Sequence, residues 1–298
     1  MELKCSLCPR KCRALRTEQI SGGMCQSTLL PTVARAAAHF GEEPCIAGER
    51  GTGAVFFTGC NLKCVFCQNR DISRGQGGMV LNVQQLRDTI LRLRDSGVDS
   101  IDLVTGTHFI PAIAEALSGL ELGIPVVWNS SGYESIEGLK MLEGLVQVYM
   151  PDFKYWDKAL AGKYSKAEDY PEVAAAAIKE MYRQVGAYEL DERGIMQRGM
   201  LIRHLILPGE KFNSMDVIDF VADEFPEDSV LFSLMSQYTP PAEGLEDYPE
   251  LQQTLEADTN SRLIRYMQKR GLSGYWQELS SATEEMLPEW DLSGLQEH

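Results

Sequence analysis

The sequence has no cysteine after Cys67: all eight of its cysteines lie between Cys5 and Cys67, in a chain of 298 residues. A disulfide scaffold would distribute cysteines throughout a short secreted chain. Crowding them at one end of a long chain favours metal binding instead.

The sequence also lacks long apolar runs. No uninterrupted stretch approaches the roughly 18 residues that a membrane-spanning helix needs, and the first residues, MELKC, lack the apolar stretch of a secretory signal. We therefore expect a cytoplasmic protein that has no membrane partner.

Basic residues are few: 28 Lys and Arg stand against 43 Asp and Glu, which gives a net charge of −15. Because phosphate contacts need clustered basic side chains, we do not expect a nucleic acid as the main partner. The apolar fraction of 44% is enough for a sizeable core. The length fits one α/β domain with an appendage better than two independent domains.

Short apolar runs alternate with amphipathic segments after residue 50, which predicts βα units and a parallel sheet. The predicted strands cover residues 54–57, 100–104, 125–128, 145–150, 200–207 and 230–234, and the predicted helices cover 83–96, 111–117, 135–142, 171–185, 214–224 and 260–269. Six such units predict an α/β fold, a partial (β/α)6 TIM-like barrel over residues 51–279. An irregular cysteine-rich segment, 1–50, precedes it, and an acidic tail, 280–298, with Trp290 as its anchor, follows it.

Three cysteines follow the first predicted strand directly. Cys60, Cys64 and Cys67 form a C-x3-C-x2-C motif. Thiolates are the usual ligands of iron–sulfur clusters, which commonly take four of them. Three thiolates on one loop could bind three irons of a four-iron cube and leave the fourth iron open to another ligand. The main alternative is a zinc site that a distant ligand completes.

This motif, with Phe66 before its last cysteine, resembles the signature of the radical S-adenosyl-L-methionine (SAM) superfamily. The longer string CNLKCVFCQN, residues 60–69, is similar to pyruvate formate-lyase-activating enzymes. The resemblance implies a [4Fe-4S] cluster whose open iron binds SAM, with Phe66 near the adenine. It further implies a flavodoxin or ferredoxin as electron donor, and cleavage of SAM to a 5′-deoxyadenosyl radical that abstracts hydrogen.

Polar side chains follow each of the later predicted strands. Because the chemistry of such barrels lies at the carboxyl ends of the strands, these side chains are predicted to surround one site. They are Thr105, Thr107 and His108, then Asn129 and Ser131, then Asp152 and Lys154, then Arg203 and His204, and finally Gln237 and Tyr238.

The resemblance assigns roles to several of these residues. The segment 105–108 takes the place of a glycine-rich motif that contacts SAM, so Thr105, Thr107 and His108 are predicted to substitute, together with Asn129 and Ser131 on the next strand. A capping or core role is the alternative for His108.

Asp152 and Lys154 resemble the Asp-x-Lys element of activating enzymes. Residues two apart share one face of a strand, so the pair can contact SAM together, with a structural ion pair as the alternative. His204, rather than its neighbour Arg203, is predicted to contact the ribose or carboxylate. Gln237 and Tyr238 are predicted to line the substrate cavity.

A second cysteine group precedes the barrel. Cys5, Cys8, Cys12 and Cys25, which we call the leader cysteines, supply four thiols. Zinc and iron–sulfur sites both commonly use four sulfurs, and the C-x2-C-x3-C spacing mildly favours a second cluster over zinc. Reduced structural cysteines are the remaining alternative. Cys45 is left over as a spare ligand, a reactive thiol or a buried small residue.

Three classes of function fit these features. The first is a radical SAM oxidoreductase, which activates a glycyl-radical enzyme or modifies a peptide, another protein or a small molecule. The second is an electron-transfer iron–sulfur protein without catalysis, which would need neither the strand–helix units nor their polar ends. The third, a zinc-bound interaction or nucleic-acid module, is disfavoured by the net charge and the absence of basic runs.

Overall fold

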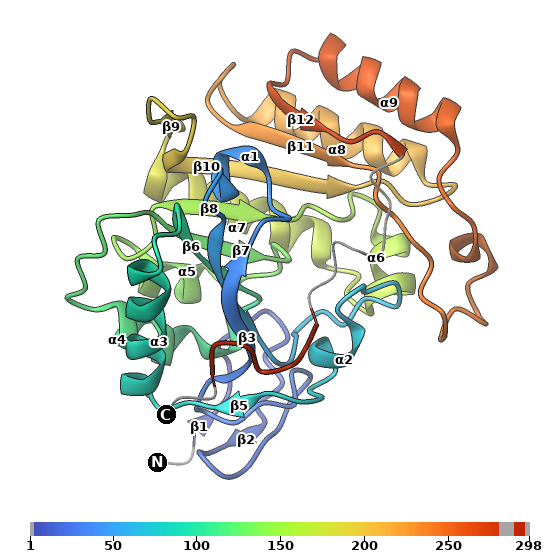
Figure 1. The fold of residues 1–298 in the computed structure, drawn as a ribbon. Helices are drawn as coiled ribbons and strands as arrows, with labels where there is room; N and C mark the ends of the chain where they lie inside the picture. The colour runs from blue at the N-terminus through green and yellow to red at the C-terminus, as the bar shows by residue number, and fades with distance from the viewer. Residues whose placement is uncertain (1–2, 280–288, 296–298) are drawn as a thin grey trace.

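A sheet of mostly parallel strands with helices on its outer face makes up the fold. The computed structural model describes residues 3–279 and 289–295 (Figure 1). In this part of the chain the sheet order is β12-β11-β10-β8-β7-β6-β4-β3-β5, and β9 pairs with β10. The parallel strands are β4 (Thr52–Phe57), β6 (Ser100–Val104), β7 (Val126–Ser130), β8 (Val148–Pro151), β10 (Met196–Leu205), β11 (Leu231–Met235) and β12 (Gly274–Trp276).

Helices connect most of these strands, as the alternating pattern predicts, so the α/β fold with a partial barrel is confirmed. The helices are α1 (Pro44–Ala47), α2 (Arg70–Ser73), α3 (Val83–Asp95), α4 (Ile110–Leu117), α5 (Ile136–Leu142), α6 (Lys158–Ser165), α7 (Tyr170–Val185), α8 (Lys211–Glu224) and α9 (Ala257–Lys269), with 3₁₀ turns at Thr107–Phe109 and Pro249–Gln252. No helix among the described residues is long and apolar enough to cross a membrane.

Local signals explain where several helices begin and end. At the start of α3, Asn82 and Gln85 form a reciprocal capping box, as expected at a helix N-terminus. Gly97 follows α3 with a φ of +89°, which favours glycine. Helix α8 begins at Lys211, three residues before the predicted start, and the Asn213 side chain accepts hydrogen bonds from backbone N–H groups of the β8–α6 loop.

Part of the segment predicted to be irregular belongs to the sheet. β3 (Thr32–His39) pairs antiparallel with β4 and with β5 (Met79–Val80). Outside the sheet, β1 (Leu3–Lys4) and β2 (Leu15–Arg16) form a small hairpin, and β9 (Glu189–Leu190) lies beside β10. After β3, helix α1 enters the barrel, where Cys45 and Ile46 pack against Val127, Val148 and Leu201.

Residues 289–295 lie across β3. Trp290 packs edge-on against Phe56, with ring centroids 5.3 Å apart, and Leu295 is fully buried. The Ala36 N–H donates to the Ser293 carbonyl over 3.0 Å. Residues 280–288 and 296–298 of the predicted tail lie outside the described residues.

Candidate active site

A cavity of about 530 Å³ opens inside the barrel, toward the carboxyl ends of the parallel strands. Its lining combines thiols, ion pairs and aromatic side chains. Among the residues predicted from the sequence, the lining includes Cys60, Cys64, Phe66, Cys67, Thr105, Asn129, Ser131, Asp152, Lys154, Arg203 and Gln237. Polar side chains from several strand ends therefore line one cavity.

The loop after β4 presents the three cysteines. Gly59 begins this loop with a φ of +94°, and a Cβ there would lie 2.6 Å from the Cys25 carbonyl oxygen, so only glycine fits. Cys60 and Cys64 are buried, and the Ser165 hydroxyl donates to the Cys64 Sγ over 3.0 Å. Burial raises the pKa of Cys60 and raises that of Cys67 to about 12. Buried thiols of this kind ionise when a cation such as a metal compensates their charge.

The donor set fits an iron–sulfur cluster. Three soft thiol ligands on one loop face one cavity, beside the ammonium group of Lys154, whose charge favours the thiolate forms of Cys60 and Cys67. The thiolates of such a cube bind separate irons, and three of them on one loop leave the fourth iron open to another ligand.

Asp152 and Lys154 form an ion pair in the cavity wall. The Lys154 Nζ lies 2.6 Å from the Asp152 Oδ2, and the Arg203 Nε donates to Asp152 Oδ1 over 2.9 Å. Burial opposes the charge on Asp152, but Lys154 and Arg203 outweigh it and lower its pKa. Burial likewise opposes the charge on Lys154, and Asp152 and the nearby thiols raise its pKa. The pair therefore stays charged at neutral pH.

Arg203 is the centre of a wider polar network, which the sequence analysis missed. Its guanidinium donates to Asn129 Oδ1 and to Glu42 Oε2, each over 2.7 Å. Glu43 also lines the cavity, and the fully buried Asp102 accepts a hydrogen bond from the Asn129 side-chain amide over 3.1 Å. Burial raises the pKa of both Glu43 and Asp102, so this region of the site favours protonated carboxyl groups.

The prediction for His204 is wrong, and Arg203 takes its place at the cavity. His204 is fully buried on the opposite face of β10. Its Nδ1 pairs with the Phe153 carbonyl over 2.7 Å, and its Nε2 pairs with the Ser214 hydroxyl over 2.9 Å. Both ring nitrogens are thus occupied by groups of the protein, and burial lowers the pKa of His204 to about 4.

Two residues of the 105–108 segment also lie away from the cavity. Thr105 lines it, with a φ of +60°, but Thr107 donates to Glu134 over 2.8 Å. The His108 Nε2 pairs with the Thr58 carbonyl over 2.9 Å, and the ring is 3% exposed. The 3₁₀ turn that begins at Thr107 directs Thr107 toward Glu134 and His108 toward Thr58, so neither side chain lies at the cavity where it was predicted to contact SAM.

Of the two aromatic residues predicted at the site, one lines the cavity and the other does not. Phe66 lines the cavity and packs against Tyr155, Tyr164 and Tyr238, with ring centroids 6.3 Å apart in each pair. Tyr238 does not line the cavity as predicted; it is buried behind Phe66 and donates to the Leu251 carbonyl.

The family model described as the Radical SAM superfamily matches residues 54–221, which is more than half of the chain. The chain belongs to the radical SAM superfamily. Membership in this superfamily implies a [4Fe-4S] cluster and SAM as cofactors, and an enzyme that uses them.

Two known relatives align with this radical SAM chain. An uncharacterized protein of Methanocaldococcus jannaschii is 30% identical over 248 residues, which are 78% of this chain and 66% of that protein. The anaerobic ribonucleoside-triphosphate reductase-activating protein of Enterobacteria phage T4 is 28% identical over 118 residues, which are 38% of this chain and 70% of that protein.

A solved structure shares the fold. The crystal structure of Streptococcus suis SuiB bound to precursor peptide SuiA has a TM-score of 0.50 and 14% identity, and the match covers 76% of this chain and 49% of that one. The radical SAM chain thus spans about half the length of this neighbour.

The remaining cysteines of the radical SAM chain lie outside the cavity lining. The leader cysteines gather beneath the cysteine loop, where Cys25 is buried and Cys12 is exposed. Cys45, on α1, is 1% exposed in the barrel interior, where burial raises its pKa to about 12. Of the three readings open for Cys45, the buried small residue fits this position.

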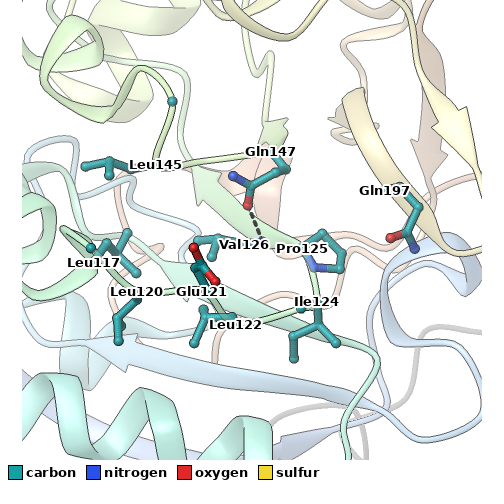
Figure 2. Close-up of a pocket in the computed structure, with 13 residues that line it drawn as sticks. Leu117, Leu120, Glu121, Leu122, Ile124, Pro125, Val126, Leu145, Gln147 and Gln197 are labelled. Atoms are coloured by element: carbon teal, nitrogen blue, oxygen red, sulfur yellow. Dashed lines mark hydrogen bonds between the residues drawn. The ribbon is translucent and has the colours of Figure 1, made fainter.

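A second hollow, of about 450 Å³, lies at the amino end of β7, and Figure 2 shows its lining. Its side chains are mostly apolar, and Glu121 supplies the single charge among them. The Gln147 side chain accepts a hydrogen bond from the Val126 N–H over 3.0 Å (Figure 2). This hollow therefore offers no group for radical chemistry.

Proposed function

We propose that Cys60, Cys64 and Cys67 hold the [4Fe-4S] cluster and that the adjoining cavity binds SAM. One observation carries the proposal: the three thiols line the same cavity as Asn129, Asp152 and Lys154. Once bound and reduced, the cluster supplies the electron that cleaves SAM to methionine and a 5′-deoxyadenosyl radical, which takes a hydrogen atom from the substrate.

The protein's own residues prepare this cavity for SAM. Lys154 presents an ammonium group that can pair with the carboxylate of SAM, and Arg203 and Lys154 together fix the carboxylate of Asp152. Asp152 is then an acceptor for a ribose hydroxyl or for the amino group of SAM, and Thr105 and Ser131 add polar groups on the neighbouring strand ends. Phe66 gives an apolar face for the adenine ring and excludes water from it.

For the substrate, we infer a glycyl-radical enzyme that this chain activates by hydrogen abstraction from a glycine. The similarity of residues 60–69 to pyruvate formate-lyase-activating enzymes supports this, and so does the partial match to the phage T4 activating protein. A flavodoxin or ferredoxin is the expected electron donor.

Radical modification of a peptide is the second candidate. The side chains of Phe40 and Trp276 line the cavity and are 66% and 45% exposed, so its mouth offers large apolar contacts to an extended chain. SuiB, which shares the fold, was crystallised with its precursor peptide.

Anaerobic reconstitution followed by reduction in the presence of SAM tests the activity, with chromatography for 5′-deoxyadenosine. We expect its formation without any substrate, at a rate that falls in a Lys154→Met variant with an intact cluster. A reducible cluster that yields no 5′-deoxyadenosine would contradict the proposal.

Electron paramagnetic resonance (EPR) then separates the two substrates. A protein glycyl radical formed on a glycyl-radical enzyme from the same genome supports activation. Transfer of hydrogen from a labelled peptide into 5′-deoxyadenosine, without a glycyl radical, supports peptide modification.

A further inference from the structure

The leader cysteines lie around a buried positive charge that has no carboxylate partner. Arg16, at the end of the hairpin β1–β2, is 2% exposed. Its guanidinium donates to the backbone carbonyls of Ser27, Thr28 and His108, and its NH1 lies 3.5 Å from the Cys5 Sγ. Within the described residues, no Asp or Glu forms an ion pair with it.

A buried guanidinium without an anion is costly, because burial removes the water that stabilises its charge. Carbonyl oxygens satisfy its N–H groups but carry no net charge. The sulfur of Cys5 is the group at Arg16 that can become an anion, and it does so when a metal binds it as a thiolate. The position of Arg16 therefore indicates a metal–thiolate centre.

The other three leader cysteines are near the same place. The 23–26 turn lies against Cys12, since a Cβ on Gly23 would come within 2.8 Å of the Cys12 Sγ, and the same turn carries Cys25. The Cys8 thiol lies within electrostatic reach of the thiols of Cys25 and Cys5. Four sulfurs from three separate turns thus surround one small region.

This region adjoins the loop of Cys60. Gly59 approaches the Cys25 carbonyl too closely for any side chain. Arg10, between Cys8 and Cys12, donates to the Asn61 carbonyl over 2.8 Å and to the Leu62 carbonyl over 3.4 Å, and these two residues lie between Cys60 and Cys64. Lys63 lies within the electrostatic reach of both Cys60 and Cys25.

The local charge also differs from that of the whole chain. Residues 1–16 contain five Lys or Arg and a single Glu, in a protein whose net charge is −15. Neutral thiols give no reason for so many basic residues. A cube held by four thiolates carries a double negative charge in its oxidised form, and basic side chains nearby stabilise that charge.

We propose that Cys5, Cys8, Cys12 and Cys25 bind a second iron–sulfur cluster, whose negative charge is balanced by Arg16 and which lies directly against the loop of the SAM-binding cluster. On binding, the four thiols release their protons to solvent and become iron ligands.

The first test counts metal in the full chain, reconstituted anaerobically with iron and sulfide. We expect about eight irons per chain, as two [4Fe-4S] clusters require, and no stoichiometric zinc. Cys8→Ala should lower the count to about four, whereas the matched control Cys45→Ala, which removes a buried thiol outside both groups, should keep about eight.

EPR spectroscopy of the Cys8→Ala variant shows which of the two clusters has been lost. In reduced Cys8→Ala, SAM should still change the EPR spectrum, because the leader is anchored to the barrel by the backbone contacts of Arg10 and not only through metal. About four irons in the wild-type chain, an unchanged count in Cys8→Ala, or one zinc in place of the second cluster would each overturn the proposal.

The role of Arg16 needs its own pair of variants. Arg16→Gln keeps a hydrogen-bond donor but removes the charge, and we expect it to lose leader iron to a chelator about tenfold faster, with a more negative reduction potential for that cluster. Arg16→Lys keeps the charge and should show a smaller change. Equal effects of the two variants would overturn the assignment of Arg16 as counter-charge. If the wild-type chain binds eight irons but forms no 5′-deoxyadenosine, the proposed function fails and the second cluster stands.

Discussion

The parallel strands open onto a cavity at their carboxyl ends and onto a hollow at the amino end of β7, whose lining Figure 2 shows. The cavity has thiols, two cations and several carboxylates in its wall, held together by Arg203. The hollow is lined mostly by Leu, Ile, Val and Pro side chains and by glycine backbone, with Glu121 as its single charged group and Gln147 accepting from a backbone N–H. The proposed site thus lies at the carboxyl ends of the strands, where barrels of this type carry their chemistry, and the hollow lies at the end that barrels use for stability.

Substitution of a cysteine in the loop after β4 should give the largest loss of activity. We expect Cys64→Ser to abolish 5′-deoxyadenosine formation, because a cube with two protein thiolates is poorly held. The loss should exceed the roughly 10–100-fold loss typical of changes outside the ligand sphere. Cys45→Ser, deeper in the barrel, should retain activity; equal loss in both variants would place the effect in the fold and not at the cluster.

Variants of Arg203 test whether its network of charged side chains contributes to SAM binding or only to the stability of the fold. Arg203→Gln leaves Glu42 and Asp152 without their shared cation, which should destabilise the protein by about 3–5 kcal/mol and weaken SAM binding. Without Arg203 the buried carboxylates bind protons more readily in the folded state, so the variant should recover relative to wild type as the pH falls. Urea unfolding at two pH values and SAM titration measure both effects, with Arg203→Lys as the charged control. Unchanged SAM affinity would assign Arg203 a purely structural role.

His204 provides a pH-dependent comparison, since it lies on the outer face of the strand that carries Arg203. Its pKa is about 4 when folded and near 6.5 when unfolded, so acidification protonates the unfolded chain first. The wild type should therefore lose stability relative to His204→Gln by about 1.4 kcal/mol per pH unit between pH 6.5 and about 4. Parallel stability curves for the two proteins across this range would refute the neutral, buried state of His204.

Gln147, in the hollow, should give the smallest effect. Gln147→Ala removes the acceptor for the Val126 N–H and should lower the free energy of unfolding by about 1 kcal/mol. SAM cleavage should be unchanged. A large loss of activity with the same small loss of stability would show that the two ends are coupled.

The sequence predicted the six strand–helix units because their apolar runs and helix signals are local. It missed β3, whose sequence TVARAAAH has few large apolar side chains and lies among the cysteines. It chose His204 over Arg203 because the two faces of β10 cannot be told apart from sequence: Leu201 faces the barrel and Ile202 the helices, yet both are apolar.

Glu42 and Glu43 show a different limit. They follow an antiparallel strand, so no rule about the carboxyl ends of parallel strands points to them. They reach the cavity because α1 enters the barrel and fills its interior, a tertiary contact that no local pattern encodes. Thr107 and His108 were misplaced for a related reason, since a 3₁₀ turn of three residues decides where they point.

The contact between β3 and residues 289–295 has a consequence for the order of folding. The hydrogen bond from Ala36 to Ser293 joins residues that are separated by most of the chain, and Trp290 covers Phe56 from the same segment. During synthesis on the ribosome, β3 must wait for Ser293 before this side of the strand is covered. Until then it is an exposed edge, open to pairing with another nascent chain. The cover that residues 289–295 give this edge therefore also protects the strand from pairing with another chain.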